Sequence, residues 1–144
     1  MGNVKHMTYD EFNQFCASFV ATTHVVQWGN SDVWKVGHKV FAIGGWSNKS
    51  APAFTFKVSD MNFDFLSHCE GYRPAPYFAN RGMKWIQQID SEGKRREELE
   101  YYLTQSYRIV AGSLSKKRQV ELGIDWGSFD YYKVLAFPSC HFSP

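Results

Sequence analysis

Four segments rich in β-branched and aromatic residues follow one another between residues 24 and 58, with no helical stretch between them. They read HVVQW, SDVWKV, KVFAIGGW and AFTFKV. Between the second and third, Gly37 stands at the first central position of a two-residue turn, which predicts a type II′ hairpin joining Val33–Val36 to Lys39–Ile43. Because strands joined by such short connections pair antiparallel, this run predicts a mainly antiparallel sheet.

Helical patterns flank this run on both sides. Thr8 and Glu11 form a capping box for a helix over 9–19 with an aromatic stripe, and Ser59 is expected to cap a second helix, DMNFDFLSHC. Met61, Phe65, Leu66 and Cys69 are expected to share its buried face. MKWIQQI then predicts one more strand, and a long helix begins near Lys94.

The order is therefore roughly α-β-β-β-β-α-β-α, which predicts a single α+β domain of two layers over residues 1–144, with a mainly antiparallel sheet and helices on one face. In AFTFKV, Phe54, Phe56 and Val58 are expected to face the core. Ala53, Thr55 and Lys57 are expected to form a solvated face of the sheet.

Composition limits the possible functions. The chain is 44% hydrophobic, which predicts a globular fold, and its net charge is only +2, so any nucleic-acid site must come from a local arrangement of basic groups. Three widely spaced cysteines argue against a disulfide framework and are typical of a reducing compartment. With no signal-peptide or membrane-span pattern, we expect a cytoplasmic protein that does not partner a membrane.

Residues with catalytic or metal-binding chemistry have simpler structural interpretations. In the pairs His68–Cys69 and Cys140–His141 the adjacent side chains point apart, so we expect no metal. Cys16 lies on the apolar helical stripe, and Glu97, Glu98 and Glu100 lie among basic residues, which is typical of a solvated first helical turn. We therefore expect neither an enzyme nor a cofactor.

Basic and polar side chains beside aromatic residues are the stronger functional candidates, because cations neutralise phosphates and aromatic rings stack on bases. The candidates are Lys35, His38, Lys39, Asn80, Arg81, Lys84, Lys116, Lys117 and Arg118. Cations at hairpin edges and helix C-termini also have ordinary structural roles.

A proline corner, GYRPAPYFANRGMKW, precedes the strand after the second helix. Pro74 and Pro76 hold this connection extended, and Tyr77 and Phe78 are expected to anchor it to the core. From this stiff base Asn80, Arg81 and Lys84 are expected to project toward a partner.

Several ordered stretches resemble the MmcQ/YjbR family, namely MTYDEFNQFC, VWKVGHKVFAI, APYFANRGMKW, QSYRIV and LSKKR, over residues 7 to about 118. The resemblance implies a double-wing fold similar to frataxin and secretion chaperones, and non-enzymatic binding to double-stranded DNA. Beyond about Gly123 the chain departs from the family pattern. The matching positions are Lys35, Lys39, Asn80, Arg81, Lys84, Trp85, Ser106, Tyr107 and Lys116 to Arg118.

Two other functions remain open. A protein-interaction or chaperone-like module could self-associate through the aromatic C-terminal tail, with Trp126, Phe129, Tyr131 and Tyr132 exposed. A small-ligand binder or enzyme would need a cleft near Tyr77, Trp85 and Tyr107.

Overall fold

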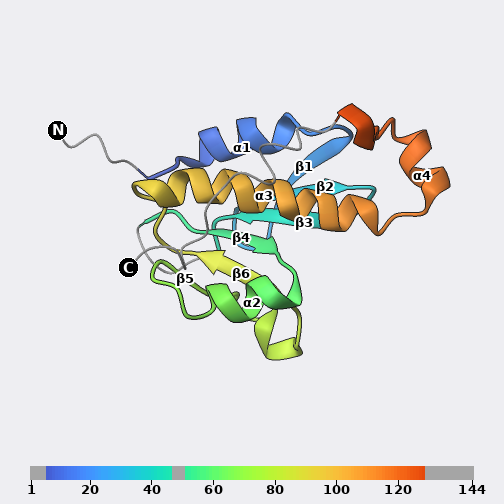
Figure 1. The fold of residues 1–144 in the computed structure, drawn as a ribbon. Helices are drawn as coiled ribbons and strands as arrows, with labels where there is room; N and C mark the ends of the chain where they lie inside the picture. The colour runs from blue at the N-terminus through green and yellow to red at the C-terminus, as the bar shows by residue number, and fades with distance from the viewer. Residues whose placement is uncertain (1–5, 47–50, 129–144) are drawn as a thin grey trace.

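A computed structural model describes residues 6–46 and 51–128 (Figure 1). It has six antiparallel strands in the order β1-β2-β3-β4-β6-β5, with helices packed on the sheet, which confirms the predicted α+β fold. The elements are α1 (Tyr9–Ala17), β1 (Thr22–Gln27), β2 (Ser31–Val36), β3 (Lys39–Gly44), β4 (Phe54–Lys57), α2 (Asp60–Leu66), β5 (Tyr72–Pro74), η1 (Ala79–Arg81), β6 (Trp85–Gln88), α3 (Lys94–Gly112), α4 (Lys116–Glu121) and η2 (Trp126–Ser128).

The β2–β3 hairpin has the predicted two-residue turn but a different turn type. Both central residues have positive φ, +57° at Gly37 and +70° at His38, as a type I′ turn requires, so the predicted type II′ turn is wrong. A bulge between Trp34 and Lys35 shifts the register of this hairpin. The turn joins strands that are each one or two residues longer than expected.

The predicted helix starts are confirmed and the predicted ends are too late. Both reciprocal hydrogen bonds of the Thr8–Glu11 capping box are present, and Ser59 caps α2. Helix α2 ends at Leu66, however, and Met61 is 78% exposed, so the predicted buried face of this helix is wrong at that position. The pattern also missed β5, because three residues ending in a proline carry little strand periodicity.

Helices α1 and α3 lie across the same face of the sheet (Figure 1) and form the main core with it. Phe12 comes from α1, Phe56 from β4, and Tyr102 from α3, and each is fully buried. At the surface Arg96 Nη2 lies 2.7 Å from Glu11 Oε2 and joins the two helices. This hydrogen bond is the main reason that the pKa of Glu11 falls to about 2.

We call the sheet face opposite α1 and α3 the second face, and the prediction that it is solvated is wrong. Ala53 and Thr55 are almost completely buried. Gln87 Nε2 donates to Thr55 Oγ1 at 3.2 Å and to the backbone carbonyl of Trp46 at 3.1 Å. The backbone of Trp46, just after β3, therefore lies over the second face, which a two-residue alternation cannot reveal.

A buried polar cluster corrects the expectation that Glu98 is solvated. Glu98 is 5% exposed, and Tyr72 Oη donates to its Oε1 at 2.5 Å. Gln88 Nε2 donates in turn to Tyr72 Oη at 3.0 Å. Burial raises the pKa of Glu98, and the cluster ties β5 and β6 to α3.

Ser106 bridges α3 to two strands. Its Oγ donates to the carbonyl of Phe41 at 2.6 Å and accepts from the amide of Lys57 at 2.9 Å. The β3–β4 ladder pairs residues 42–44 with 54–56. Phe41 and Lys57 lie just beyond this ladder, and the Ser106 hydroxyl bridges their backbone groups.

Substitution Ser106→Ala is expected to lower the free energy of unfolding by about 1–3 kcal/mol, because it leaves a backbone carbonyl and amide without their partner. Urea unfolding followed by circular dichroism measures this loss. The matched control is Ser18→Ala at the exposed C-cap of α1, where the hydroxyl donates to the local carbonyl of Phe15, with an expected change within about 0.5 kcal/mol. Equal effects of the two substitutions would contradict the bridging role.

Candidate nucleic-acid interface

The β2–β3 turn packs on the C-terminal end of α3. Lys39 Nζ donates to Ser113 Oγ at 3.2 Å. Gly37 fits closely against Leu114, because a Cβ atom at position 37 would lie 2.6 Å from Leu114 Cδ1. The turn is therefore fixed beside the connection between α3 and α4.

Helix α4 starts directly after this connection and carries a basic first turn. Ser115 caps it by accepting from the amide of Arg118 at 3.1 Å. Lys116 and Lys117 are exposed, and Arg118 lies 3.6 Å from Glu121. We call these residues and those of the turn the hairpin group: His38, Lys39, Lys116, Lys117 and Arg118.

Asn80, Arg81 and Lys84, here called the corner group, are all exposed on the β5–β6 connection. Arg81 Nη1 donates to Tyr77 Oη at 3.1 Å, and its guanidinium carbon lies 5.6 Å from the Tyr77 ring centre. Lys84 Nζ lies 4.7 Å from the ring centre of Phe63 on α2. Nearby rings therefore orient both cations, while their charged ends remain accessible.

The anchoring predicted for the corner is half confirmed. The rings of Phe78 and Trp85 lie 4.8 Å apart, so Phe78 packs on a buried tryptophan. Tyr77, in contrast, is 56% exposed with a φ of +75°. Tyr77 belongs to the surface, where it holds Arg81.

The register places both groups at the same end of the sheet, which we call the turn end. The β2–β3 turn lies at this end, and β4 runs toward it from Phe54 to Lys57. Lys57 pairs with Trp85, the first residue of β6, so the corner leads into β6 at the turn end. In Figure 1, α4 lies at the far right, and the yellow-green segment 79–81 lies at the bottom, below α2. Asp60, which starts α2, adds a negative charge here.

The remaining candidates belong to neither exposed group. Lys35 is half-buried in β2, between two core residues, and its side chain therefore points to the second face. Trp85, Ser106 and Tyr107 are buried. Tyr107 Oη donates to the carbonyl of Val20 at 2.7 Å, and burial raises its pKa to about 12. The buried side chains among these candidates therefore belong to the core of the fold.

The cysteines and the histidine considered above as nucleophiles or metal ligands occupy the following positions. Cys16 is buried, and burial raises the pKa of its thiol well above 9.0, which is the opposite of activation. Cys69 is half-buried against the core, beyond the end of α2. Cys140 and His141 lie outside the described residues.

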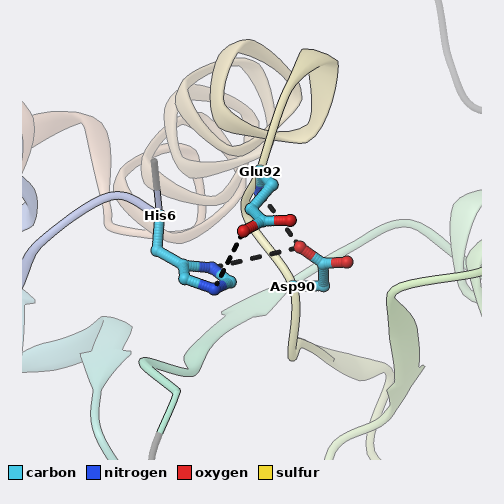
Figure 2. Close-up of side chains that lie close together, drawn as sticks. All are labelled: His6, Asp90 and Glu92. Atoms are coloured by element: carbon cyan, nitrogen blue, oxygen red, sulfur yellow. Dashed lines mark hydrogen bonds and ion pairs between the residues drawn. The ribbon is translucent and has the colours of Figure 1, made fainter. Parts of the chain in front are cut away.

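One cluster of three groups with ligand atoms close enough for a metal ion occurs within residues 6–46 and 51–128: His6, Asp90 and Glu92 (Figure 2). His6 Nε2 lies 3.5 Å from Glu92 Oε2, and its Nδ1 lies 4.0 Å from Asp90 Oδ1. Arg95 Nη1 is only 3.2 Å from Asp90 Oδ2 and already balances that carboxylate. The amide of Met7 also donates to Ser91 Oγ at 2.8 Å, so the cluster fastens the segment before α1 to the β6–α3 connection.

An aromatic hollow of about 410 Å³ lies over the second face, lined by Trp28, Trp46, Tyr77 and Phe78. Of the cleft predicted near Tyr77, Trp85 and Tyr107, only Tyr77 contributes to it. Sequence reasoning missed Trp28 and Trp46, which come from two other connections. The sequence feature that could have identified them is a tryptophan next to a glycine at the end of a predicted strand, in WGN and in GGW.

None of the helices in the described part of the chain is both long and apolar enough to cross a bilayer.

Comparison with known proteins identifies relatives of this fold. The model of the YjbR family matches residues 17–109. No curated protein matches the sequence. The crystal structure of DR2400 from Deinococcus radiodurans, a protein with a DUF419 domain, is 20% identical with a TM-score of 0.70, over 86% of this chain and 96% of that protein. At this identity the likeness concerns the fold alone.

Proposed function

The chain belongs to the YjbR family, and on this premise we propose that it binds double-stranded DNA through phosphate contacts made by the turn end of its sheet. The proposal involves contact with the DNA backbone and no chemical step, and it requires no metal or cofactor.

The observation that carries the proposal is the packing of the β2–β3 turn on the α3–α4 connection. Lys39 and Lys117 are far apart in the sequence, and the Lys39–Ser113 hydrogen bond brings the turn beside α4. Exposed cations from two segments of the chain thereby lie close together. A strong phosphate site needs such a local cluster of positive charge here, because the net charge of the whole chain is only +2.

The corner group extends this surface along the same end of the sheet. Strand β4 separates β3 from β6, so the β2–β3 turn and the first residue of β6 belong to strands whose axes lie two strand spacings, or about 10 Å, apart. The major groove of B-DNA is about 12 Å wide. In this proposal the hairpin group and the corner group, which both lie at the turn end, contact phosphates on either side of a groove. Such contacts fix the protein on the duplex without reading sequence.

Affinity for a short duplex is expected to fall steeply with salt, because each phosphate contact adds about 0.9 to the slope of log affinity against log salt concentration. Lys117→Glu and Lys84→Glu are each expected to flatten this slope by about 1. Fluorescence anisotropy of a labelled duplex across a salt series measures both effects.

The matched control is Lys94→Glu, which changes the net charge equally but lies at the start of α3, at the other end of the sheet. It is expected to leave the slope unchanged. If all three substitutions weaken binding equally, overall charge and not the turn end determines affinity. A wild-type slope near zero would overturn the proposal itself.

A second candidate, a protein-interaction module, is favoured by the edge strand β1. Its residues Thr23, His24, Val25 and Val26 are all exposed, and none of the six residues is Lys, Arg, Asp or Glu. The opposite edge, β5, is short and ends in a proline, as protected edges do. Phe129, Tyr131 and Tyr132, proposed earlier as the contact, lie outside the described residues, and Trp126 is half-buried on the core.

If β1 pairs with a second copy of the chain, Val26→Lys is expected to convert a dimer to a monomer, because charge on an edge strand opposes strand pairing. Size-exclusion chromatography with light scattering measures the mass. Met61→Lys, at a residue 78% exposed on α2, serves as the control and should leave the dimer intact. A wild-type monomer at all accessible concentrations would contradict this candidate.

A further inference from the structure

We infer that the aromatic hollow on the second face holds one unpaired nucleobase of single-stranded DNA, with the adjoining phosphate at Arg81. This inference rests on the proposed function and extends it from the phosphate backbone to a base. Paired bases inside a duplex do not offer their faces, so the hollow requires a single strand or a free nucleotide.

The rings of the hollow present accessible faces. Trp28 is 45% exposed and Tyr77 56% exposed. The ring centres of Trp28 and Trp46 are 6.2 Å apart with planes inclined by 29°, which is too close for a base between them, because two ring contacts need about 7 Å. The base is therefore placed on the accessible faces of Trp28 and Tyr77. A volume of about 410 Å³ lies in the range of small-molecule sites.

The backbone of the hollow is strained. Trp28, Trp46 and Tyr77 have φ values of +53°, +67° and +75°. Six described residues other than glycine have positive φ, and these three line the same hollow. Bulky residues seldom adopt this conformation, and such strain gathers where function requires a fixed arrangement.

Polar side chains beneath the rings hold this arrangement. Arg73 Nη2 donates to Gln87 Oε1 at 2.6 Å, and Gln87 Nε2 donates to the carbonyl of Trp46 at 3.1 Å. The Trp46 ring then contacts Phe78, with ring centres 5.2 Å apart. The hollow is thus preformed, and a ligand gains stacking without first ordering the site.

The charge beside the hollow selects the ligand class. No lining residue is acidic, and Arg81 stands over the Tyr77 ring. Arg81 Nε and Nη2 make no hydrogen bond or ion pair with the described residues, so both can donate to an anion. A cationic ligand bound by these rings would lie beside the positive charge of Arg81 and would be repelled by it. A stacked base with a phosphate satisfies both the rings and the arginine.

The test compares three labelled DNAs by anisotropy: a thymidine oligomer of about 12 nucleotides, an abasic oligomer with the same number of phosphates, and a duplex. Wild-type protein is expected to bind the thymidine oligomer about 10-fold more tightly than the abasic one. Trp28→Gly should abolish this difference and leave duplex affinity unchanged. Glycine readily adopts a φ of +53°, so the melting temperature should stay equal or rise. Met61→Ala is the control for an exposed apolar residue outside the hollow.

The outcomes separate this inference from the proposed function. Equal binding of the thymidine and abasic oligomers, with no effect of Trp28→Gly, would overturn the base site and leave duplex binding intact. If no DNA binds even at low salt, the proposed function fails, and adenosine monophosphate is then titrated against tryptophan fluorescence. Quenching that Tyr77→Gly removes, with Trp28 retained as the reporter, would support the hollow as a nucleotide site, and absent quenching would overturn it.

Discussion

One buried hydroxyl joins α3 to two strands of the sheet, within the apolar core that packs the helix on that face. Ser106 satisfies the carbonyl of Phe41 and the amide of Lys57 where the β3–β4 ladder stops, so α3 is fixed to both strands at once. A helix held there ends beside the β2–β3 turn, where Leu114 packs on Gly37. The hairpin group is assembled by these contacts together with the apolar core, because they hold α3 on the sheet and the end of α3 places α4 beside the turn.

The two faces of the sheet are covered by different means. Helices α1 and α3 cover one face with a continuous apolar core, while the second face is covered in part by Trp46 and Phe78 from connections between strands. Three aromatic residues of the hollow have a positive φ, which bulky residues seldom adopt. Because the aromatic cover leaves a hollow beside Arg81, this face offers a ligand a surface that the helical face does not.

Local patterns in the sequence predicted local structure well. The Thr8–Glu11 capping box, the Ser59 cap and the β2–β3 hairpin all depend on residues within a few positions of one another. The burial of Glu98 and Thr55 was not predictable, because it depends on partners such as Tyr72 and Gln87 that are distant in the sequence. The basic candidates could be named from the sequence by residue type alone. That the hairpin group and the corner group lie at the same end of the sheet follows only from the strand register, because the two groups are distant in the sequence.

Chemical-shift mapping of the backbone amides during titration with a short DNA duplex at low salt tests the central claim most directly. The account predicts that the largest shifts fall at 37–39, 80–84 and 113–118, at the turn end. Residues 90–94, at the opposite end of the sheet, should remain unshifted and serve as the internal reference. Shifts spread evenly over the basic residues of both ends, or concentrated at 90–94, would contradict a DNA interface at the turn end.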